Sequence, residues 1–310
     1  MIHVPVLLEE VVRGLNLKPG QLIVDGTVGG GGHARAILER TAPHGKLLGF
    51  DRDESTLAAA AEYLSEFGDR VSLVHASFAS LGEHIAQLDF QPLHGVLLDL
   101  GLSSDQLADS ARGFSFHSTG VLDLRYDTAQ GQPAYELLQT YSERELERVF
   151  REFGEEPKSR ALARALVQAR RTHPIRTVAD LLAVVGLVKK GSHRSLHPAT
   201  LVWQALRIEV NHELEHVEKG IRAAVAALTG GGRIVVISFH SGEDRIVKEV
   251  FREESRDCIC PPEVPLCQCH HQARLKIITR KPMEASSSEK RVNTRARSAK
   301  LRIAEKVAFS

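Results

Sequence analysis

Asp25, Asp51 and Asp99 are the residues whose positions most directly suggest chemistry, because each ends a short apolar run. The runs are residues 22–25, 47–51 and 96–99. They are typical of buried parallel strands, whose carboxyl ends meet at one edge of a sheet. We therefore expect three carboxylates around one ligand. At the end of the second strand, Asp51 is placed to accept both hydroxyl hydrogens of a ribose.

The first strand continues into the loop VDGTVGGGGH, residues 24–33, which has four consecutive glycines before His33. Such a run indicates backbone that a Cβ would obstruct. A P-loop requires Gly-Lys-Ser/Thr after its glycines, and this chain has His33-Ala34-Arg35 there, which excludes it. The glycines do not match the dinucleotide spacing G-x-G-x-x-G either. Asp25 would repel a pyrophosphate and attract the cationic end of S-adenosylmethionine, so a methyl-donor pocket is favoured over a nicotinamide pocket.

Phe78 follows the third strand, residues 71–75, and could pack against an adenine ring. A core position is the alternative for this side chain.

Strands alternating with helical patterns predict an α/β chain with a doubly wound, Rossmann-like sheet. A fifth strand, residues 233–239, follows a turn at TGGG, and two late segments around 274–282 and 299–307 could pair antiparallel. Between the fourth and fifth strands, residues 105–198 show only helical patterns, with capping boxes at Ser142–Glu145 and Thr177–Asp180. We therefore expect an inserted all-helical domain at 105–198 and a discontinuous domain of 1–104 and 199–310. One long helix from about Ala199 would return the chain from the insert to the fifth strand.

Charge is unevenly distributed, although the net charge is only +1. Residues 271–310 carry eleven Lys/Arg against three Glu, and residues 158–176 carry six Lys/Arg and no acid. Two basic segments on a near-neutral body suggest a polyanionic partner, with solvated helix faces and a mobile tail as the alternative. The sequence shows no membrane span and no secretory signal, which predicts a cytoplasmic protein.

All four cysteines lie in CICPPEVPLCQC, at Cys258, Cys260, Cys267 and Cys269. Clustered thiols in a cytoplasmic chain favour metal over disulfides, but C-x-C pairs are tighter than the usual C-x2-C zinc knuckle. The pattern leaves open a structural zinc and, slightly favoured, a reduced surface loop. No metal is assigned.

Nine motifs occur in order from His3 to Arg302: HVPVLLEEV, VDGTVGGGGH, GFDRD, LLDLGLSSDQL, RGFSF, LDLRYD, HPATLVWQALRIEVN, ISFHSGEDR and NTRARSAKLR. Together they closely resemble the bacterial 16S rRNA cytosine-N4 methyltransferase family (RsmH/MraW). The resemblance implies a class I S-adenosylmethionine-dependent methyltransferase fold with a helical insert. It also implies methylation of the exocyclic N4 of cytidine 1402 in the decoding centre of the small ribosomal subunit, by a monomer or a homodimer.

The resemblance also implies site residues. By matching motif, the cofactor S-adenosylmethionine would contact Gly31, Gly32, His33, Asp51, Phe78, Asp99 and Gln106. Charge complementarity adds Asp25 to this set. We expect Asp99, Ser103 and Ser104 to be catalytic and the RNA to contact Arg112, Phe114, Phe116, Asp123, Arg125, His240, Arg295 and Arg297. A core position is an equal alternative for Phe114 and Phe116, and a surface salt-bridge ladder is the alternative for Asp123 and Arg125. His240 could instead be structural. Departures from the family pattern, Leu124, Tyr126, Trp203, Gly242 and Thr294, affect no charged or donor-contacting position. The cysteine segment varies in the family, which weakens an essential role for a metal.

Two other interpretations also fit the sequence. A nicotinamide-dependent oxidoreductase could use the same fold, but it would not explain the basic segments or the insert. A non-catalytic RNA-binding assembly factor could keep the pocket without using it, and the three intact strand-end aspartates argue against that decay.

Overall fold

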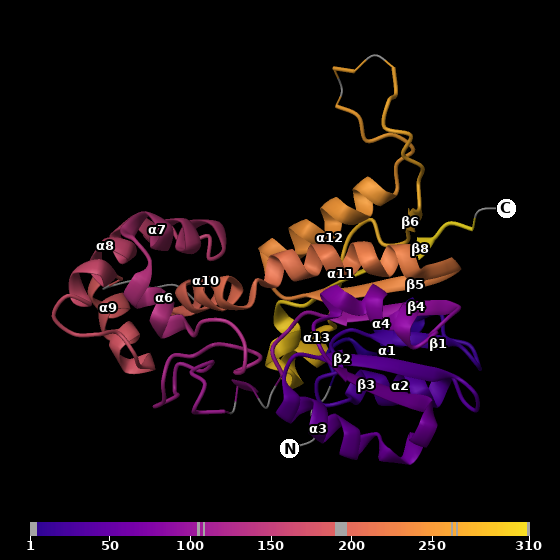
Figure 1. The fold of residues 1–310 in the computed structure, drawn as a ribbon, viewed down its shortest axis with the longest axis horizontal. Helices are drawn as coiled ribbons and strands as arrows, with labels where there is room; N and C mark the ends of the chain where they lie inside the picture. Colours follow the sequence, from indigo (N-terminus) through magenta and orange to yellow (C-terminus); the bar gives the residue numbers. More distant parts are fainter. Residues whose placement is uncertain are drawn as a thin grey trace. The chain divides into compact units, whose positions relative to one another are not determined.

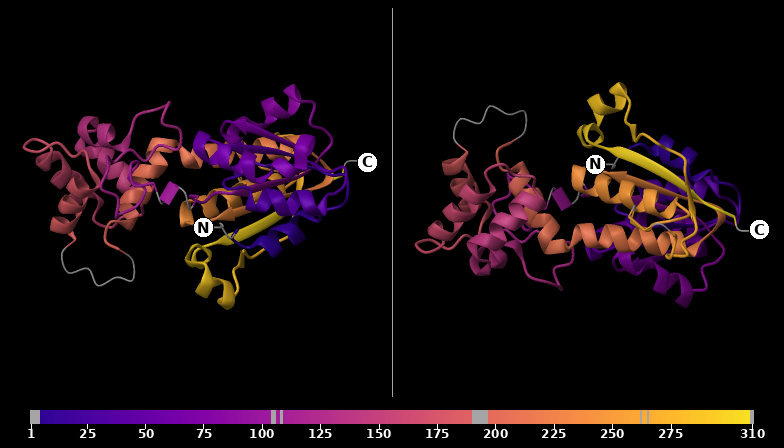
Figure 2. Two further views of the ribbon diagram at one scale, coloured as in Figure 1. Left: turned by 90° about the horizontal axis from the view of Figure 1, so that it is seen from below. Right: turned by 90° about the horizontal axis from the view of Figure 1, so that it is seen from above.

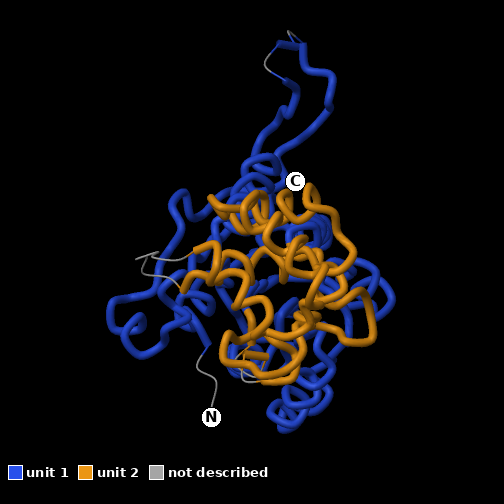
Figure 3. Tube along the Cα trace, turned by 90° about the vertical axis from the view of Figure 1, so that its left-hand side faces the viewer, with its two compact units in different colours: residues 1–101, 214–310 blue, residues 102–213 orange. Residues whose placement is uncertain are grey.

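The computed structural model describes residues 5–103, 106–107, 109–189, 197–261, 263–264 and 266–308. The chain divides into two compact units, residues 1–101 with 214–310 and residues 102–213, which Figure 3 colours separately. Each unit has its own buried apolar core.

The first unit is built on one sheet with the strand order β3-β2-β1-β4-β5-β8-β6, with β7 also paired to β8 (Figure 1). The strands are β1 (Leu22–Asp25), β2 (Lys46–Asp51), β3 (Val71–His75), β4 (Leu93–Asp99), β5 (Leu228–Ser238), β6 (Leu275–Ile277), β7 (Met283–Glu284) and β8 (Lys300–Lys306). The first five are parallel, whereas β8 runs antiparallel to β5 and to β6. The predicted doubly wound sheet and its antiparallel closing pair are confirmed.

Helices cover both faces of this sheet (Figure 2). One layer contains α1 (Leu8–Leu15), α2 (Gly32–Arg40) and α3 (Glu54–Tyr63), and the opposite layer contains α4 (Leu81–Gln87), α11 (Glu213–Ala227) and α12 (Ser241–Glu254). The short helix α13 (Ser287–Val292) precedes β8. Because both faces are covered, the central strands are mainly apolar, and Asp25, Asp51 and Asp99 lie at the carboxyl ends of β1, β2 and β4. The strand order reverses between β1 and β4, which is where ligands bind in such sheets.

The second unit is helical. Its elements are α6 (Ala134–Thr140), α7 (Glu143–Glu152), α8 (Ser159–Ala169), α9 (Val178–Val188) and α10 (Thr200–Asn211). Both predicted capping boxes are present, Ser142 with Glu145 at α7 and Thr177 with Asp180 at α9. One isolated bridge joins Val121 to Thr177. Within its described residues the unit therefore has its own helix-based core, as an inserted domain requires.

The single long helix expected from Ala199 is wrong. His212 has a φ of 51°, in the left-handed region, and this residue separates α10 from α11. The amide of Asn211 fixes the break by donating to the carbonyls of Leu124, at 2.7 Å, and Arg207, at 2.9 Å. Since Val202 and Leu206 of α10 pack in the second unit's core, that unit extends to Glu213.

The turn expected at TGGG lies inside β5. Leu228 pairs with Leu93 and Arg233 pairs with Gly95, so residues 229–232 form an irregularity between two paired positions. Gly231 has a φ of 81° there, which a residue with a side chain rarely adopts. A bulge explains why the segment reads as a turn although the strand continues through it.

Candidate active site

The strand-end carboxylates of Asp25 and Asp99 lie on either side of the point where the strand order reverses. The registers pair Asp25 with Leu97 of β4 and Asp99 with Ile237 of β5. The hydroxyl of Thr27 accepts the backbone N–H of Asp99 at 2.6 Å, which ties the loop after β1 to the end of β4. The predicted arrangement of these carboxylates at one edge is therefore built into the sheet.

Asp51 holds the glycine loop. Its Oδ2 accepts the N–H of Gly29 at 2.9 Å, and its Oδ1 accepts the N–H of Asp53 at 2.9 Å. Burial raises the pKa of Asp51, and the N–H groups of Asp53 and Gly29 work against this rise. Each carboxylate oxygen can accept more than one hydrogen bond, so this role leaves capacity for the diol predicted from the sequence.

Asp25 is fully buried. Its Oδ1 accepts the N–H of Thr27 at 3.1 Å, and its Oδ2 has no hydrogen-bond partner among the described residues. Burial raises the pKa of Asp25 to about 7; His33 and the N–H of Thr27 oppose the rise, and Asp99 and Asp51 add to it. A buried carboxylate with an unpaired oxygen is costly unless something else compensates its charge.

His33 lies in the first turn of α2, with its Nε2 3.6 Å from Oδ2 of Asp99. Both its ring nitrogens and Oδ1 of Asp99 are buried without a hydrogen-bond partner in the described part of the chain. The side chain of Asp99 is 16% exposed. Unpaired acceptors from Asp25 and Asp99, with an imidazole beside them, form a site suited to a polar ligand carrying positive charge.

The glycines serve the backbone of this loop. Gly29 and Gly31 have φ values of 50° and 84°, and Gly31 is the N-cap of α2. A Cβ on Gly32 would collide with the Pro5 ring, and one on Gly31 would lie 3.2 Å from Tyr63. Positive φ and close packing together explain why side chains are absent here. Direct contact of Gly31 and Gly32 with a donor stays a prediction.

Phe78 follows β3 and is half-buried. Its ring packs where Gly220 of α11 has no side chain, because a Cβ there would collide with it. A Cβ on Gly26 would lie 2.9 Å from the Phe78 Cβ. Phe78 therefore connects the glycine loop to α11, and its contact with an adenine ring stays a prediction.

Arg295 lies close enough to the carboxylate edge to interact with it electrostatically, which the sequence did not indicate. Burial lowers the pKa of Arg295, and the negative charge of Asp99 opposes this. The side chain is half-buried, whereas Arg297 is exposed and donates to the Lys290 carbonyl at 3.3 Å. Arg295 and Arg297, both predicted to contact RNA, thus have different surroundings.

His240 is the N-cap of α12. Its ring accepts the N–H of Glu243, and its Nε2 lies 3.0 Å from the Glu243 carboxylate. The Glu243 carboxylate also accepts the N–H of Phe239 at 2.7 Å. The Phe239 ring packs on Gly101, two residues after Asp99, where an added Cβ would lie 2.7 Å from the ring. These contacts assign His240 a structural role, and its contact with RNA stays a prediction.

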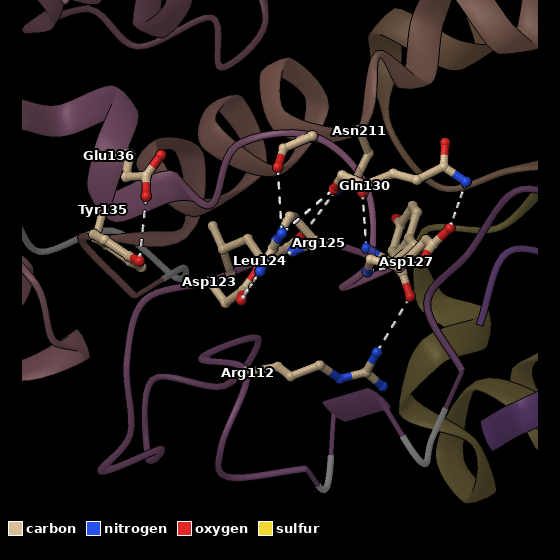
Figure 4. A network of polar contacts seen from close by, with 12 residues as sticks. Arg112, Asp123, Leu124, Arg125, Asp127, Gln130, Tyr135, Glu136 and Asn211 are labelled. Atoms are coloured by element: carbon tan, nitrogen blue, oxygen red, sulfur yellow. Dashed lines mark hydrogen bonds and ion pairs between the residues drawn. The ribbon is translucent and has the colours of Figure 1, made fainter. Parts of the chain in front are cut away.

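In the helical unit, residues of the LDLRYD segment form a network of hydrogen bonds and ion pairs (Figure 4). Arg125 donates to both carboxylate oxygens of Asp123, at 2.7 and 2.8 Å, and to the Gly131 carbonyl. Arg112 donates to Asp109 at 2.9 Å and to the Tyr126 carbonyl at 3.3 Å. The predicted RNA contacts Arg112, Asp123 and Arg125 are therefore already ordered by partners within their own unit.

Leu124, in the same segment, has a φ of 64°. Asn211 fixes this conformation by donating to the Leu124 carbonyl at 2.7 Å and accepting the Tyr126 N–H at 2.8 Å. The segment is therefore not extended throughout. Leu122 and Leu124 are nevertheless buried, and Asp123 and Arg125, which alternate with them, are half-buried.

The two RGFSF phenylalanines differ in burial. Phe114 is 5% exposed and stacks on Tyr126, with ring centroids 5.8 Å apart. Phe116 is half-buried, stacks on His197 at 4.5 Å and meets Trp203 edge-on at 5.1 Å. Phe114 is a core residue, and Phe116 keeps more access to a base.

Ser103 and Gln106 cap each other in this unit. Ser103 donates its N–H to the Gln106 side chain, and Gln106 donates its N–H to the Ser103 hydroxyl, both at 3.0 Å. Ser104, also predicted to be catalytic, lies outside the described residues.

Two further features bear on the partner. Among the described residues, none of the helices has the length and apolar character to cross a membrane.

The basic C-terminal region is folded into the sheet: Arg302 is buried and donates to both oxygens of Asp244, at 2.7 and 3.1 Å. Part of the positive charge counted in this region is therefore paired within the chain.

The chain is similar to known proteins over nearly its whole length. A sequence profile of the MraW methylase family matches residues 1–307. The chain is 49% identical over 302 residues to the Ribosomal RNA small subunit methyltransferase H of Syntrophotalea carbinolica, covering 97% of this chain and 96% of that one. It is 50% identical over 309 residues to the protein of that name from Trichlorobacter lovleyi, covering 98% of each.

Proposed function

Because the chain belongs to the MraW methylase family, we propose that it transfers a methyl group from S-adenosylmethionine to the exocyclic N4 of a cytidine in small-subunit 16S rRNA. The proposed target is cytidine 1402 of the decoding centre. The observation that carries this proposal is the set of unpaired buried acceptors of Asp25 and Asp99 beside His33. Since rRNA is the proposed substrate, the cytoplasm is the proposed location.

These residues fit the proposed donor. The donor supplies a methyl group on a cationic sulfonium, next to an ammonium group. The carboxylates of Asp25 and Asp99 would offset this positive charge, and ligand binding would keep Asp25 ionised despite its burial. Asp51, fixed by Gly29, would accept from the ribose diol. A pyrophosphate would place negative charge beside the same carboxylates, which argues against a nicotinamide dinucleotide.

The acceptor nitrogen, N4 of cytosine, is a weak nucleophile and needs a positioned proton acceptor. The N4 lone pair of cytosine is delocalised into the ring, so attack requires the nitrogen to pyramidalise and lose a proton. That proton becomes strongly acidic once the methyl is transferred, and positioned acceptors suffice. We assign the first acceptor role to Asp99, whose Oδ1 has no partner among the described residues and whose backbone is fixed by Thr27. Ser103 and Ser104 follow it in the chain as further candidates.

The helical unit is the proposed RNA-reading part. Its α8 carries exposed Arg160 and Arg164, which line a groove together with Pro157, Lys158 and Ala161. Phosphate contacts by such side chains supply sequence-independent affinity. Phe116 is the proposed stacking partner for a base, because base stacking on aromatic rings is a common way to hold an unpaired nucleotide.

Two measurements test the proposal separately. Calorimetric titration with S-adenosylhomocysteine and with NAD should show binding of the first and none of the second; the reverse would support an oxidoreductase. Methyl transfer should then be faster on assembled small subunits than on a short naked hairpin, since the insert offers more surface than one base needs. Donor binding with no transfer to either substrate would favour a non-catalytic assembly factor.

A further inference from the structure

The four cysteines of the chain converge in space in the segment between α12 and β6. Their Sγ atoms all lie within 4.8 Å of one another. Cys269 Sγ is 3.6 Å from Cys267 Sγ and 3.9 Å from Cys258 Sγ, and all four thiols are free. A tetrahedral zinc ion with Zn–S bonds of about 2.3 Å places its sulfur ligands about 3.8 Å apart. Two of the S···S distances thus match a tetrahedral four-cysteine site, and no pair of the four sulfurs is more than 4.8 Å apart.

The backbone supports this convergence in a reciprocal way. Ile259, between the first pair of cysteines, donates its N–H to Cys269 Sγ at 3.4 Å. Gln268, between the second pair, donates its N–H to Cys260 Sγ at 3.4 Å. Each C-x-C pair therefore orients a sulfur of the other pair. Such N–H···S contacts favour a thiolate over a neutral thiol at the accepting sulfur.

The segment needs a stabilising element that the apolar core does not supply. No described residue from 258 to 269 belongs to a core cluster, and the apolar Ile259 and Leu266 are 40% and 76% exposed. Figure 1 shows the segment extending away from the sheet. At its base, Arg274 donates to both oxygens of the buried Glu254 carboxylate, at 2.6 Å each. The base is thus fixed by an ion pair, whereas the described residues from 258 to 269 have no core contact to fix them.

We propose that Cys258, Cys260, Cys267 and Cys269 bind one zinc ion that holds the tip of this segment. Thiolate sulfur in a tetrahedral set selects zinc over magnesium or calcium, which prefer oxygen ligands. All four ligand positions are taken by protein, so the site is closed to substrate and its role is structural. Partial exposure of the four cysteines leaves a path for the ion to enter. Sequence spacing slightly favoured a reduced loop; the reciprocal geometry reverses that preference.

The test uses the full chain, purified under reducing conditions, loaded with zinc and dialysed. Elemental analysis should give about one zinc per chain, and cobalt(II) in its place should give the intense visible bands of tetrahedral thiolate coordination. Because the chain has only four cysteines, the variant with all four changed to Ser has no thiol left. It should lose stoichiometric zinc, and Cys260→Ser alone should bind zinc at least ten-fold more weakly in a chelator competition.

The matched control is Gln268→Ala, which changes the same loop but keeps the backbone N–H and every cysteine; it should bind zinc like the unmodified chain. A second measurement covers the case in which the cysteine variants misfold. In the unmodified chain, a chelator should speed the reaction of all four thiols with a thiol reagent. The proposal is overturned if the loaded chain holds little zinc, if the variant without cysteines holds as much, if iron is bound in preference, or if the chelator leaves thiol reactivity unchanged.

Discussion

Nε2 of His33 lies 3.6 Å from Oδ2 of Asp99, and both groups lie at the edge of the sheet where the strand order reverses. Neither the imidazole nitrogens nor Asp99 Oδ1 has a hydrogen-bond partner among the described residues. Asp25 adds a fully buried carboxylate to this edge. Such a concentration of unsatisfied polar atoms costs stability in the free protein and is offset when a ligand of the right charge binds.

Asp25 should make stability depend on pH. Its folded pKa of about 7 lies above the ordinary 3.8, so the folded protein holds a proton that the unfolded chain releases. The contribution of this proton to the free energy of unfolding is fully present below about pH 4 and is lost as pH rises through about 7, a loss of about 4 kcal/mol at most. Denaturant unfolding from pH 4.5 to 8 should therefore show that the free energy of unfolding falls less with pH in Asp25→Asn than in the unmodified chain. Exposed Asp69→Asn is the control, and equal slopes for Asp25→Asn and the unmodified chain would contradict the assignment.

Asp51→Ala should weaken binding of S-adenosylhomocysteine by about 1–3 kcal/mol, the scale of a lost charge-assisted hydrogen bond. The change removes the proposed ribose acceptor and also the acceptor for the Gly29 N–H. Calorimetry at constant pH measures the difference, with Asp69→Ala as the matched aspartate. Unchanged affinity in a folded Asp51→Ala protein would remove Asp51 from the donor site.

Gly101→Ala should destabilise the first unit by about 1–3 kcal/mol, because the new methyl group would lie 2.7 Å from the Phe239 ring. Gly82→Ala in α4 is the matched control: its nearest neighbour would be Ala223 at 3.9 Å, so the helix should be unharmed or slightly stabilised. Denaturant midpoints compare the two variants. Equal midpoints would show that a methyl group at position 101 does not clash with the Phe239 ring.

The basic segments should contribute to RNA affinity through phosphate contacts. Arg160 and Arg171 are exposed, whereas Arg170 donates to the Leu138 and Tyr141 carbonyls at 2.7 Å each and supports the fold. The double variant of Arg160 and Arg171 to Ala should reduce the slope of log affinity against log salt by roughly 0.7–0.9 per lost contact.

Donor affinity should stay unchanged in this double variant, because the proposed donor residues lie in the other unit. Arg13→Ala, an exposed arginine of α1 outside the basic segments, is the control. If the double variant keeps the full salt slope, these arginines are solvated side chains without a role in RNA binding.

The sequence predicted the sheet and its strand-end aspartates because apolar runs that end in Asp are local patterns. It did not predict that Arg295 lies within electrostatic reach of Asp99, since that depends on how β8 and the turns before it fold back onto the sheet. The break at His212 was missed because neither Gly nor Pro marks it; the left-handed residue is held by Asn211 through contacts distant in sequence. The meeting of the two C-x-C pairs likewise depends on a chain reversal that spacing alone does not fix.

The most direct test of the central claim is the chemical identity of the methylated nucleoside. Small ribosomal subunits lacking the modification are incubated with the protein and a donor carrying a labelled methyl group, and the rRNA is digested to nucleosides. We predict label in N4-methylcytidine at one position, and a loss of roughly 100-fold in rate for a folded Asp99→Asn protein. Label in a C5-methylpyrimidine or a ribose 2′-O-methyl group, or no label with intact donor binding, would contradict the account.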